Sequence, residues 1–177
     1  MQSSKRCWLM VRKFVNERNI FMKKDTIHLY LFFATALMLL DRLTKYLVMY
    51  MLPHYKINEI CSIDLVFNRG ISFGLFHSDN VMIFTAVNML IGFVVTMLLF
   101  HAFYRVLAGQ SIRAEVCIFV GALSNIIDRY VYGGVIDFIA LSYRNWHFAV
   151  FNVADMFIFC GVVWMLFVEY KSACKKK

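Results

Sequence analysis

The groups in this sequence whose types and spacing could do chemistry lie between residues 121 and 155. Six polar residues fall in or beside strongly apolar segments there: Asn125, Asp128, Arg129, Asp137, Asn152 and Asp155. An ionisable side chain in apolar surroundings loses its hydration, so it persists only where it faces a partner, a bundle interior or a wet cavity. Three acids in this setting predict a functional site.

Two of these acids, Asp137 and Asp155, have no cation beside them in the sequence. Asp137 follows the glycine pair at 133–134, where the backbone can approach another segment closely. If the fold brings the two carboxyls together, they cannot both ionise and must share one proton. Such a pair offers one acid and one base, which together can activate a water molecule against a carbonyl group.

An amide stands three residues before an acid twice in this stretch. Asn125 precedes Asp128 and Asn152 precedes Asp155, a spacing that places each pair on one helix face. Each amide could supply the hydrogen bond that a buried carboxyl requires. Arg129 directly follows Asp128 and is its expected charge partner, so Asp128 is interpreted as architectural.

The composition defines the class of protein that must position these groups. The chain has 177 residues, of which 61% are hydrophobic and 17% aromatic, which indicates one integral membrane domain. The net charge of +8 does not form an aromatic-interleaved basic face, so nucleic acid is not an expected partner. The five cysteines and five histidines show no ligand spacing, and we expect no disulfide framework, metal or other cofactor.

Four apolar segments are long enough to cross a hydrocarbon core of about 30 Å at about 1.5 Å per residue. They cover about 27–51, 81–104, 114–130 and 148–168. The first contains Asp41 and Lys45, which are four apart and share a helix face. This spacing fits an internal ion pair and a role in the site equally well.

Residues 54–80 are polar enough to leave the bilayer. Ile63, Leu65 and Phe67 alternate as in a half-exposed strand, and Asn68 with Gly70 then marks a turn. The predicted fold class is an all-α integral membrane protein with four transmembrane helices and a small extracytoplasmic β element between the first two. The predicted domain covers 22–177. Residues 1–21 form a basic extension, expected to be weakly ordered or to precede a start at Met22.

The distribution of positive charge predicts the orientation in the membrane. The amino-terminal flank, the loop between the second and third spans, and the tail hold 13 of the 19 Lys and Arg residues, so both termini are expected in the cytoplasm. Asp155, seven residues after Phe148, would then lie roughly 10 Å below the outer surface. Asp41 and Asp128 reach a similar depth, which favours one site near the extracytoplasmic face.

Five blocks of the sequence, in order, resemble bacterial lipoprotein signal peptidase, also called signal peptidase II. They are Asp41-x-x-x-Lys45, Phe67-Asn68-x-Gly70, Asn125-x-x-Asp128-Arg129, Val135-x-Asp137-Phe138 and Phe151-Asn152-x-Ala154-Asp155. The resemblance covers the chain from about Met22 to its end. The chain departs from the pattern at Ser124, where family members usually carry glycine.

The resemblance implies an intramembrane aspartyl endopeptidase of the bacterial inner membrane with Asp137 and Asp155 as its catalytic dyad. It implies two supporting sets: Asn125, Asp128, Arg129 and Asn152 in the pocket, and Asp41, Lys45, Asn68 and Gly70 around it. The implied substrates are prolipoproteins, cleaved before a diacylglyceryl-modified cysteine, and membrane lipid is the other partner. We expect a monomer.

Two other classes of protein compete with this interpretation. In a proton-coupled transporter or channel, intramembrane acids relay protons, but four spans without an inverted repeat argue against it. A structural membrane subunit with paired buried ions would not explain why Asp137 and Asp155 lack neighbouring cations.

Overall fold

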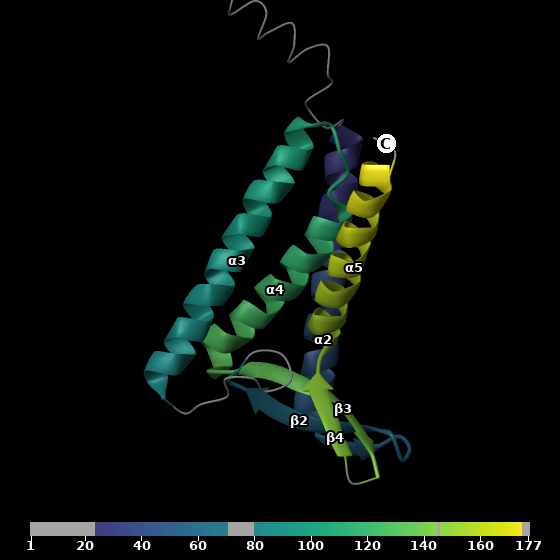
Figure 1. Cartoon of the computed structure of the whole chain (residues 1–177). Helices are drawn as coiled ribbons and strands as arrows, with labels where there is room; N and C mark the ends of the chain where they lie inside the picture. Colours follow the sequence, from purple (N-terminus) through teal and green to yellow (C-terminus); the bar gives the residue numbers. More distant parts are fainter. Residues whose placement is uncertain (1–23, 71–79, 145, 175–177) are drawn as a thin grey trace, which may run out of the picture.

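The computed structural model describes residues 24–70, 80–144 and 146–174, so the predicted extension at 1–21 lies outside the described residues. Its elements are α2 (Lys24–Met51), β1 (His54–Lys56), β2 (Cys61–Asn68), α3 (Val81–Leu107), α4 (Arg113–Tyr132), β3 (Val135–Tyr143), β4 (Trp146–Phe151) and α5 (Val153–Cys174). The helices run along one another, and the sheet lies across one end of them (Figure 1).

Three of the four described helices, α2 from Thr26, α3 and α5, are long and apolar enough to cross a membrane. These three correspond to the first, second and fourth predicted spans. The predicted third span corresponds to α4, which carries four charged residues in 20 positions: Arg113, Glu115, Asp128 and Arg129. Three of these four are buried against the protein, so α4 supplies much of the polar interior of the bundle.

The sheet is larger than the sequence analysis predicted. Strand β2 confirms the β element expected at 54–80, but residues 135–151 add β3 and β4, giving the antiparallel order β1-β2-β3-β4. The all-α class is therefore wrong. Helix α5 begins at Val153 and not at Phe148, which belongs to β4. A continuous apolar run shows no alternation of polar and apolar residues. Its periodicity therefore cannot show whether the run forms a strand or a helix.

The junction between α2 and the sheet holds a compact apolar core. Val48 of α2 packs with Ile136 and Phe138 of β3, and all three side chains are buried. Strand β3 pairs with β2 so that Val66 faces Asp137 and Asn68 faces Val135. Gly133 ends α4 with a φ of 70°, a left-handed conformation that glycine adopts without strain, and the chain turns there directly into β3.

Helices α4 and α5 approach each other at small residues. A Cβ atom added at Gly121 would lie 2.5 Å from the carbonyl oxygen of Ala154, and one added at Gly161 would lie 2.9 Å from that of Ala114. Small residues allow helix backbones to pack this closely in membrane bundles. The contact fixes the first turn of α5, which carries Asp155, against α4.

A second polar cluster, not predicted from the sequence, joins three helices at the end of the bundle away from the sheet. Arg105 of α3 places Nε 3.1 Å from Oε1 of Glu115 in α4, and both residues are buried. His101 lies 3.4 Å from Glu115 and, through its other ring nitrogen, 3.5 Å from Glu169 of α5. This cluster ties α3 to its neighbours far from the sheet.

Replacing Arg105 by Ala is expected to lower the free energy of unfolding by about 3–5 kcal/mol, because Glu115 would keep a buried charge without its principal partner. Thermal unfolding in detergent would measure the loss. The exposed Arg113 provides the matched control, Arg113→Ala, which should stay close to wild type. The double variant Arg105→Ala/Glu115→Gln should recover part of the loss; an unchanged melting temperature in Arg105→Ala would contradict the expectation.

Candidate active site

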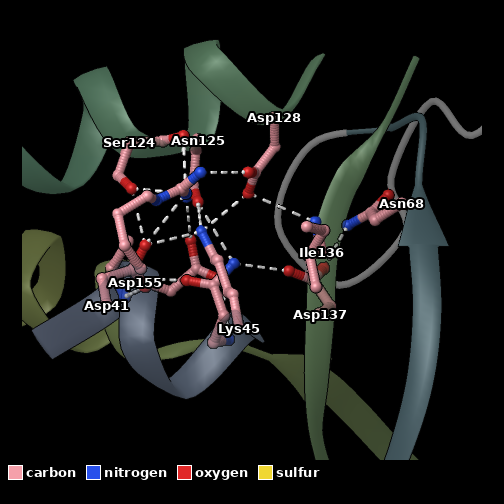
Figure 2. Close-up of polar contacts among 12 residues, drawn as sticks. Asp41, Lys45, Asn68, Ser124, Asn125, Asp128, Ile136, Asp137 and Asp155 are labelled. Atoms are coloured by element: carbon pink, nitrogen blue, oxygen red, sulfur yellow. Dashed lines mark hydrogen bonds and ion pairs between the residues drawn. The ribbon is translucent and has the colours of Figure 1, made fainter. Parts of the chain in front are cut away.

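Asp137 lies on β3 with its side chain buried among amide donors. Only 2% of the surface of Asp137 is exposed. The Oδ2 atom accepts a hydrogen bond from Nδ2 of Asn68 at 2.9 Å, and Oδ1 accepts one from Nδ2 of Asn152 at 2.6 Å. Figure 2 shows Asp137 with its Asn68 contact where β3 runs beside β2. The acid is thus held by residues from β2 and from the entry to α5.

Asp155 lies in the first turn of α5. Oδ1 of Asn152 accepts from the backbone N–H of Asp155 at 2.9 Å, and Oδ2 of Asp155 accepts from the backbone N–H of Asn152 at 3.3 Å. This reciprocal pair is a capping box, in which the residue before the helix and the third helical residue satisfy each other's backbone donors. The other oxygen of Asp155 accepts from Nδ2 of Asn125 at 2.9 Å.

The capping box corrects two expectations about this segment. Asn152 precedes α5 and does not share a helix face with Asp155. The acid is the third residue of its helix, so helix rise places it only about 3 Å from the helix start, whereas the prediction assumed seven residues, or roughly 10 Å, of helix before it. The prediction placed the start of the helix five residues too early, inside β4.

The titration of Asp137 reflects its surroundings. Burial is the largest effect, followed by the negative charge of Asp155, and together they raise the pKa of Asp137 to about 7. Hydrogen bonds from Asn68 and Asn152 and the charge of Lys45 act in the opposite direction. Asp137 can therefore hold a proton at neutral pH.

The raised pKa predicts how stability depends on pH. Because folded Asp137 binds its proton up to about pH 7 and an unfolded aspartate loses it near pH 4, folding becomes less favourable as pH rises through this window. Wild type is expected to lose stability from pH 4 to 7 relative to Asp137→Asn, which cannot titrate. Unfolding curves of both proteins at several pH values measure the difference; parallel profiles would contradict the prediction.

Four buried or half-buried ions connect α2 with α4. Nζ of Lys45 lies 2.9 Å from Asp41 and 2.7 Å from Asp128, while Arg42 lies 3.1 Å and 2.7 Å from the same two acids. Lys45 also donates to Oδ1 of Asn125 at 2.9 Å. Asp41, Lys45, Asn125 and Asp128 face one another in Figure 2. The structure thus contains the Asp41–Lys45 ion pair and also links that pair to the site through Asn125.

Arg129 does not form the ion pair with Asp128 that its position in the sequence suggested. Consecutive residues of a helix point about 100° apart, so Asp128 faces α2 and Arg129 faces the turn after β2. Arg129 donates to the carbonyl oxygens of Arg69, at 3.3 Å, and of Gly70. Asn68 accepts from the backbone N–H of Gly70 at 2.9 Å, which confirms the predicted turn.

An apolar groove of about 430 Å³ begins at the two acids and continues between α3, α4 and α5. Leu98, Ile118 and Met165 line its walls toward the end away from the sheet. Asn68, Asn125 and Arg129 line the end where Asp137 and Asp155 lie. Among the described residues that line the groove, these aspartates are the only two acids. The described part of the chain contains no group of three His, Cys, Asp or Glu residues that could hold a metal ion.

The structure brings the predicted site residues into one connected network, with Gly70 and Arg129 at its rim. Two members were missed: Arg42, and Ser124 as a hydrogen-bonding residue. The hydroxyl of Ser124 donates to Asp41 at 2.6 Å and accepts from Arg42 at 2.5 Å. The sequence could have indicated a role for Arg42, because a cation inside a predicted membrane span requires a partner.

Two carboxyls that line one apolar groove, within a bundle whose long helices can cross a membrane, form the arrangement expected of a membrane-embedded aspartic hydrolase. Residues 33–171 match the family model for signal peptidase (SPase) II. The chain belongs to this family of aspartic peptidases. The match covers all five sequence blocks on which the resemblance rested.

Similar proteins support the same assignment. The lipoprotein signal peptidase of Pelagibacter ubique is 35% identical over 122 residues, covering 64% of this chain and 67% of the relative. That of Thermodesulfovibrio yellowstonii is 34% identical over 139 residues, covering 77% and 90%. A bacterial membrane enzyme solved by the in meso method at 2.3 Å resolution superposes with a TM-score of 0.68 at 22% identity, covering 85% of this chain and 93% of that one, and so shares the fold.

Proposed function

We propose that this signal peptidase cleaves prolipoproteins just before a diacylglyceryl-modified cysteine, with Asp137 and Asp155 as its catalytic dyad. The observation that carries the proposal is Asn152, which contacts both acids at the polar end of an apolar groove. Asn68 and Asn125 each hold one oxygen of one acid, so the pair is oriented from both sides. Gly70 and Arg129 support the pocket from the turn after β2.

The two acids can hydrolyse a peptide bond with one shared proton. The ionised carboxylate takes a proton from a water molecule, whose oxygen attacks the scissile carbonyl carbon. The protonated carboxyl, a role for which the raised pKa suits Asp137, donates its proton to the carbonyl oxygen. When the tetrahedral intermediate collapses, the C–N bond breaks and the leaving amine takes a proton from the dyad.

The peptidase domain is proposed to span the membrane with the sheet on the extracytoplasmic side. The start of α2, the end of α5 and the α3–α4 connection all lie at the opposite end of the bundle (Figure 1). In the sequence, the clusters of Lys and Arg adjoin these three segments, and the positive-inside rule then places this end of the bundle in the cytoplasm. Helix α4 would be the fourth span, with its charges turned toward the protein. The enzyme is proposed to act as a monomer.

Cysteine labelling can test this orientation. Cys61 lies on β2 of the sheet and Cys174 at the end of α5. Two variants that each retain only one of these cysteines are treated in intact spheroplasts with a membrane-impermeant thiol reagent. Cys61 should be labelled from outside and Cys174 only after lysis. Labelling of Cys174 in intact cells would place the active site on the other side of the membrane.

The requirement for a lipidated cysteine follows from the position of the acids. They lie at the end of the bundle beside the sheet, where a substrate must hold its scissile bond at the membrane surface. Each buried acyl CH₂ contributes about 0.8 kcal/mol to membrane residence, so two chains would keep the cysteine at this level. The apolar walls of the groove can receive the rest of the membrane segment.

Matched peptides with and without the diacylglyceryl group test the substrate class. Cleavage rates are compared at equal membrane-bound concentration, so that delivery to the membrane does not contribute. The lipidated peptide should be cleaved faster by wild type. Equal rates would limit the acyl chains to delivery and remove lipid recognition from the proposal.

A further inference from the structure

Two acids outside the proposed dyad, Asp41 and Asp128, each hold the backbone beside one of the two catalytic aspartates. Oδ1 of Asp41 accepts from the backbone N–H of Ala154 at 2.8 Å, one residue before Asp155. Oδ2 of Asp128 accepts from the backbone N–H of Ile136 at 3.4 Å, one residue before Asp137. Figure 2 shows the second contact reaching across from α4 to β3. The spacing between the two catalytic segments therefore depends on how Asp41 and Asp128 are held relative to each other.

One cation cannot neutralise these two acids. Both have an exposed fraction of 0%, and Lys45, which contacts both, brings a single positive charge. A buried carboxylate without a full partner is costly, so the pair needs a second cation. Arg42 supplies it, because its guanidinium reaches Asp128 with one nitrogen and Asp41 with another. The four side chains then form a group without net charge.

Ser124 fixes the direction of the Arg42 fork. One guanidinium nitrogen donates to both the hydroxyl of Ser124, at 2.5 Å, and its carbonyl oxygen, at 3.1 Å. The same hydroxyl donates to Asp41 at 2.6 Å. Ser124 is fully buried. The serine therefore links the second cation to the acid that holds the start of α5.

Neither residue lines the groove proposed to receive the substrate. The described residues that line the groove of Asp137 and Asp155 include neither Arg42 nor Ser124. Arg42 instead lines a different groove, beside Tyr46 and Tyr132. Any effect of these two residues on the reaction must pass through the two acids that they hold, Asp41 and Asp128.

We infer that Arg42 and Ser124 are positioning residues of the cleavage reaction: with Lys45 they lock Asp41 and Asp128, which in turn set the separation of the two catalytic aspartates. The inference rests on the dyad proposed above. It predicts that removing either side chain slows the chemical step without weakening substrate binding, because small errors in the placement of reacting groups are costly for the transition state.

Steady-state cleavage of a diacylglyceryl peptide tests the inference with four variants: Arg42→Met, Arg42→Lys, Ser124→Ala and the double variant Arg42→Met/Ser124→Ala. Arg42→Met should lower kcat by about 10- to 100-fold, while KM stays within about twofold. Arg42→Lys restores the charge but not the fork, and should recover part of kcat. Arg113→Met is the matched control, since Arg113 is exposed. Thermal unfolding gives the folded fraction of each sample.

Ser124→Ala keeps all four ions, so it decides the outcome if Arg42→Met does not fold. It should lower kcat by about tenfold, which corresponds to about 1.4 kcal/mol. The double variant should lose little more than Arg42→Met, because the two side chains act through the same contact. Independent, additive losses would overturn the inference, as would a Ser124→Ala enzyme with wild-type kcat or an Arg42→Lys enzyme no better than Arg42→Met.

The dyad variants separate failure of this inference from failure of the proposed function. If Asp137→Asn and Asp155→Asn are inactive while Ser124→Ala cleaves at the wild-type rate, only the positioning role fails. If either aspartate variant remains active, the dyad assignment fails and the inference fails with it.

Discussion

Asp137→Asn and Asp155→Asn should each reduce kcat for a lipidated peptide by about 10²- to 10⁴-fold, the range that general acid-base catalysis contributes. Asparagine has nearly the shape of aspartate but cannot exchange the proton that the reaction transfers. The dyad acts as a unit, so the double variant should be about as slow as either single variant. Purified enzyme in lipid, with kcat and KM determined separately, provides the measurement.

The control for these variants is Asp64→Asn. Asp64 lies on β2 of the same sheet, is partly exposed and bonds to His54 and Ser62, away from the groove. It should cleave at the wild-type rate. Substantial cleavage by either purified dyad variant would falsify the assignment, provided that membrane insertion and thermal unfolding show the variant to be folded.

Asp128→Ala should lower stability as well as activity. The change leaves Lys45 and Arg42 with only Asp41 between them, and breaking a buried ion pair in this way typically costs about 3–5 kcal/mol. It also removes the acceptor for the backbone N–H of Ile136, beside Asp137. We therefore expect a lower melting temperature together with a lower kcat.

The double variant Arg42→Met/Asp128→Asn tests the cause of this loss, because it removes one charge of each sign. It should regain part of the stability lost in Asp128→Ala while remaining slow in cleavage. An Asp128→Ala enzyme that is as stable as wild type yet inactive would instead move Asp128 into the catalytic group.

The sequence analysis anticipated which polar residues lie together better than it anticipated the strands. Acids and amides inside apolar segments carry a large energetic cost, so this argument selected Asp137, Asp155, Asn125 and Asn152 as site candidates, whereas Asn68 entered the predicted site only through the family resemblance. The contacts among these residues were harder to predict from the sequence. Asp128 has a cation next to it in sequence, but its ion partners lie 86 and 83 residues earlier, at Arg42 and Lys45.

The strands after α4 were missed for a different reason. Residues 148–151 are apolar at consecutive positions and lie just before an apolar helix, so no alternation indicated β4. The start of the helix was consequently placed too early, and the length of helix before Asp155 was overestimated. The capping box of Asn152 and Asp155 was visible in the sequence as the spacing of an amide and an acid, but it was interpreted as a helix face.

The ion group shared by α2 and α4 has a consequence for how the chain is made. Helix α2 leaves the ribosome carrying Asp41, Arg42 and Lys45. Asp41 can pair at once with Lys45, which lies on the next turn of the same helix. Asp128, the acid that pairs with Arg42, follows 86 residues later in the chain. At a synthesis rate of about 5–20 residues per second, this is a delay of roughly 4–17 s. During that interval these three side chains carry a surplus positive charge, so we expect the final seating of α2 in the bilayer to wait for the arrival of α4.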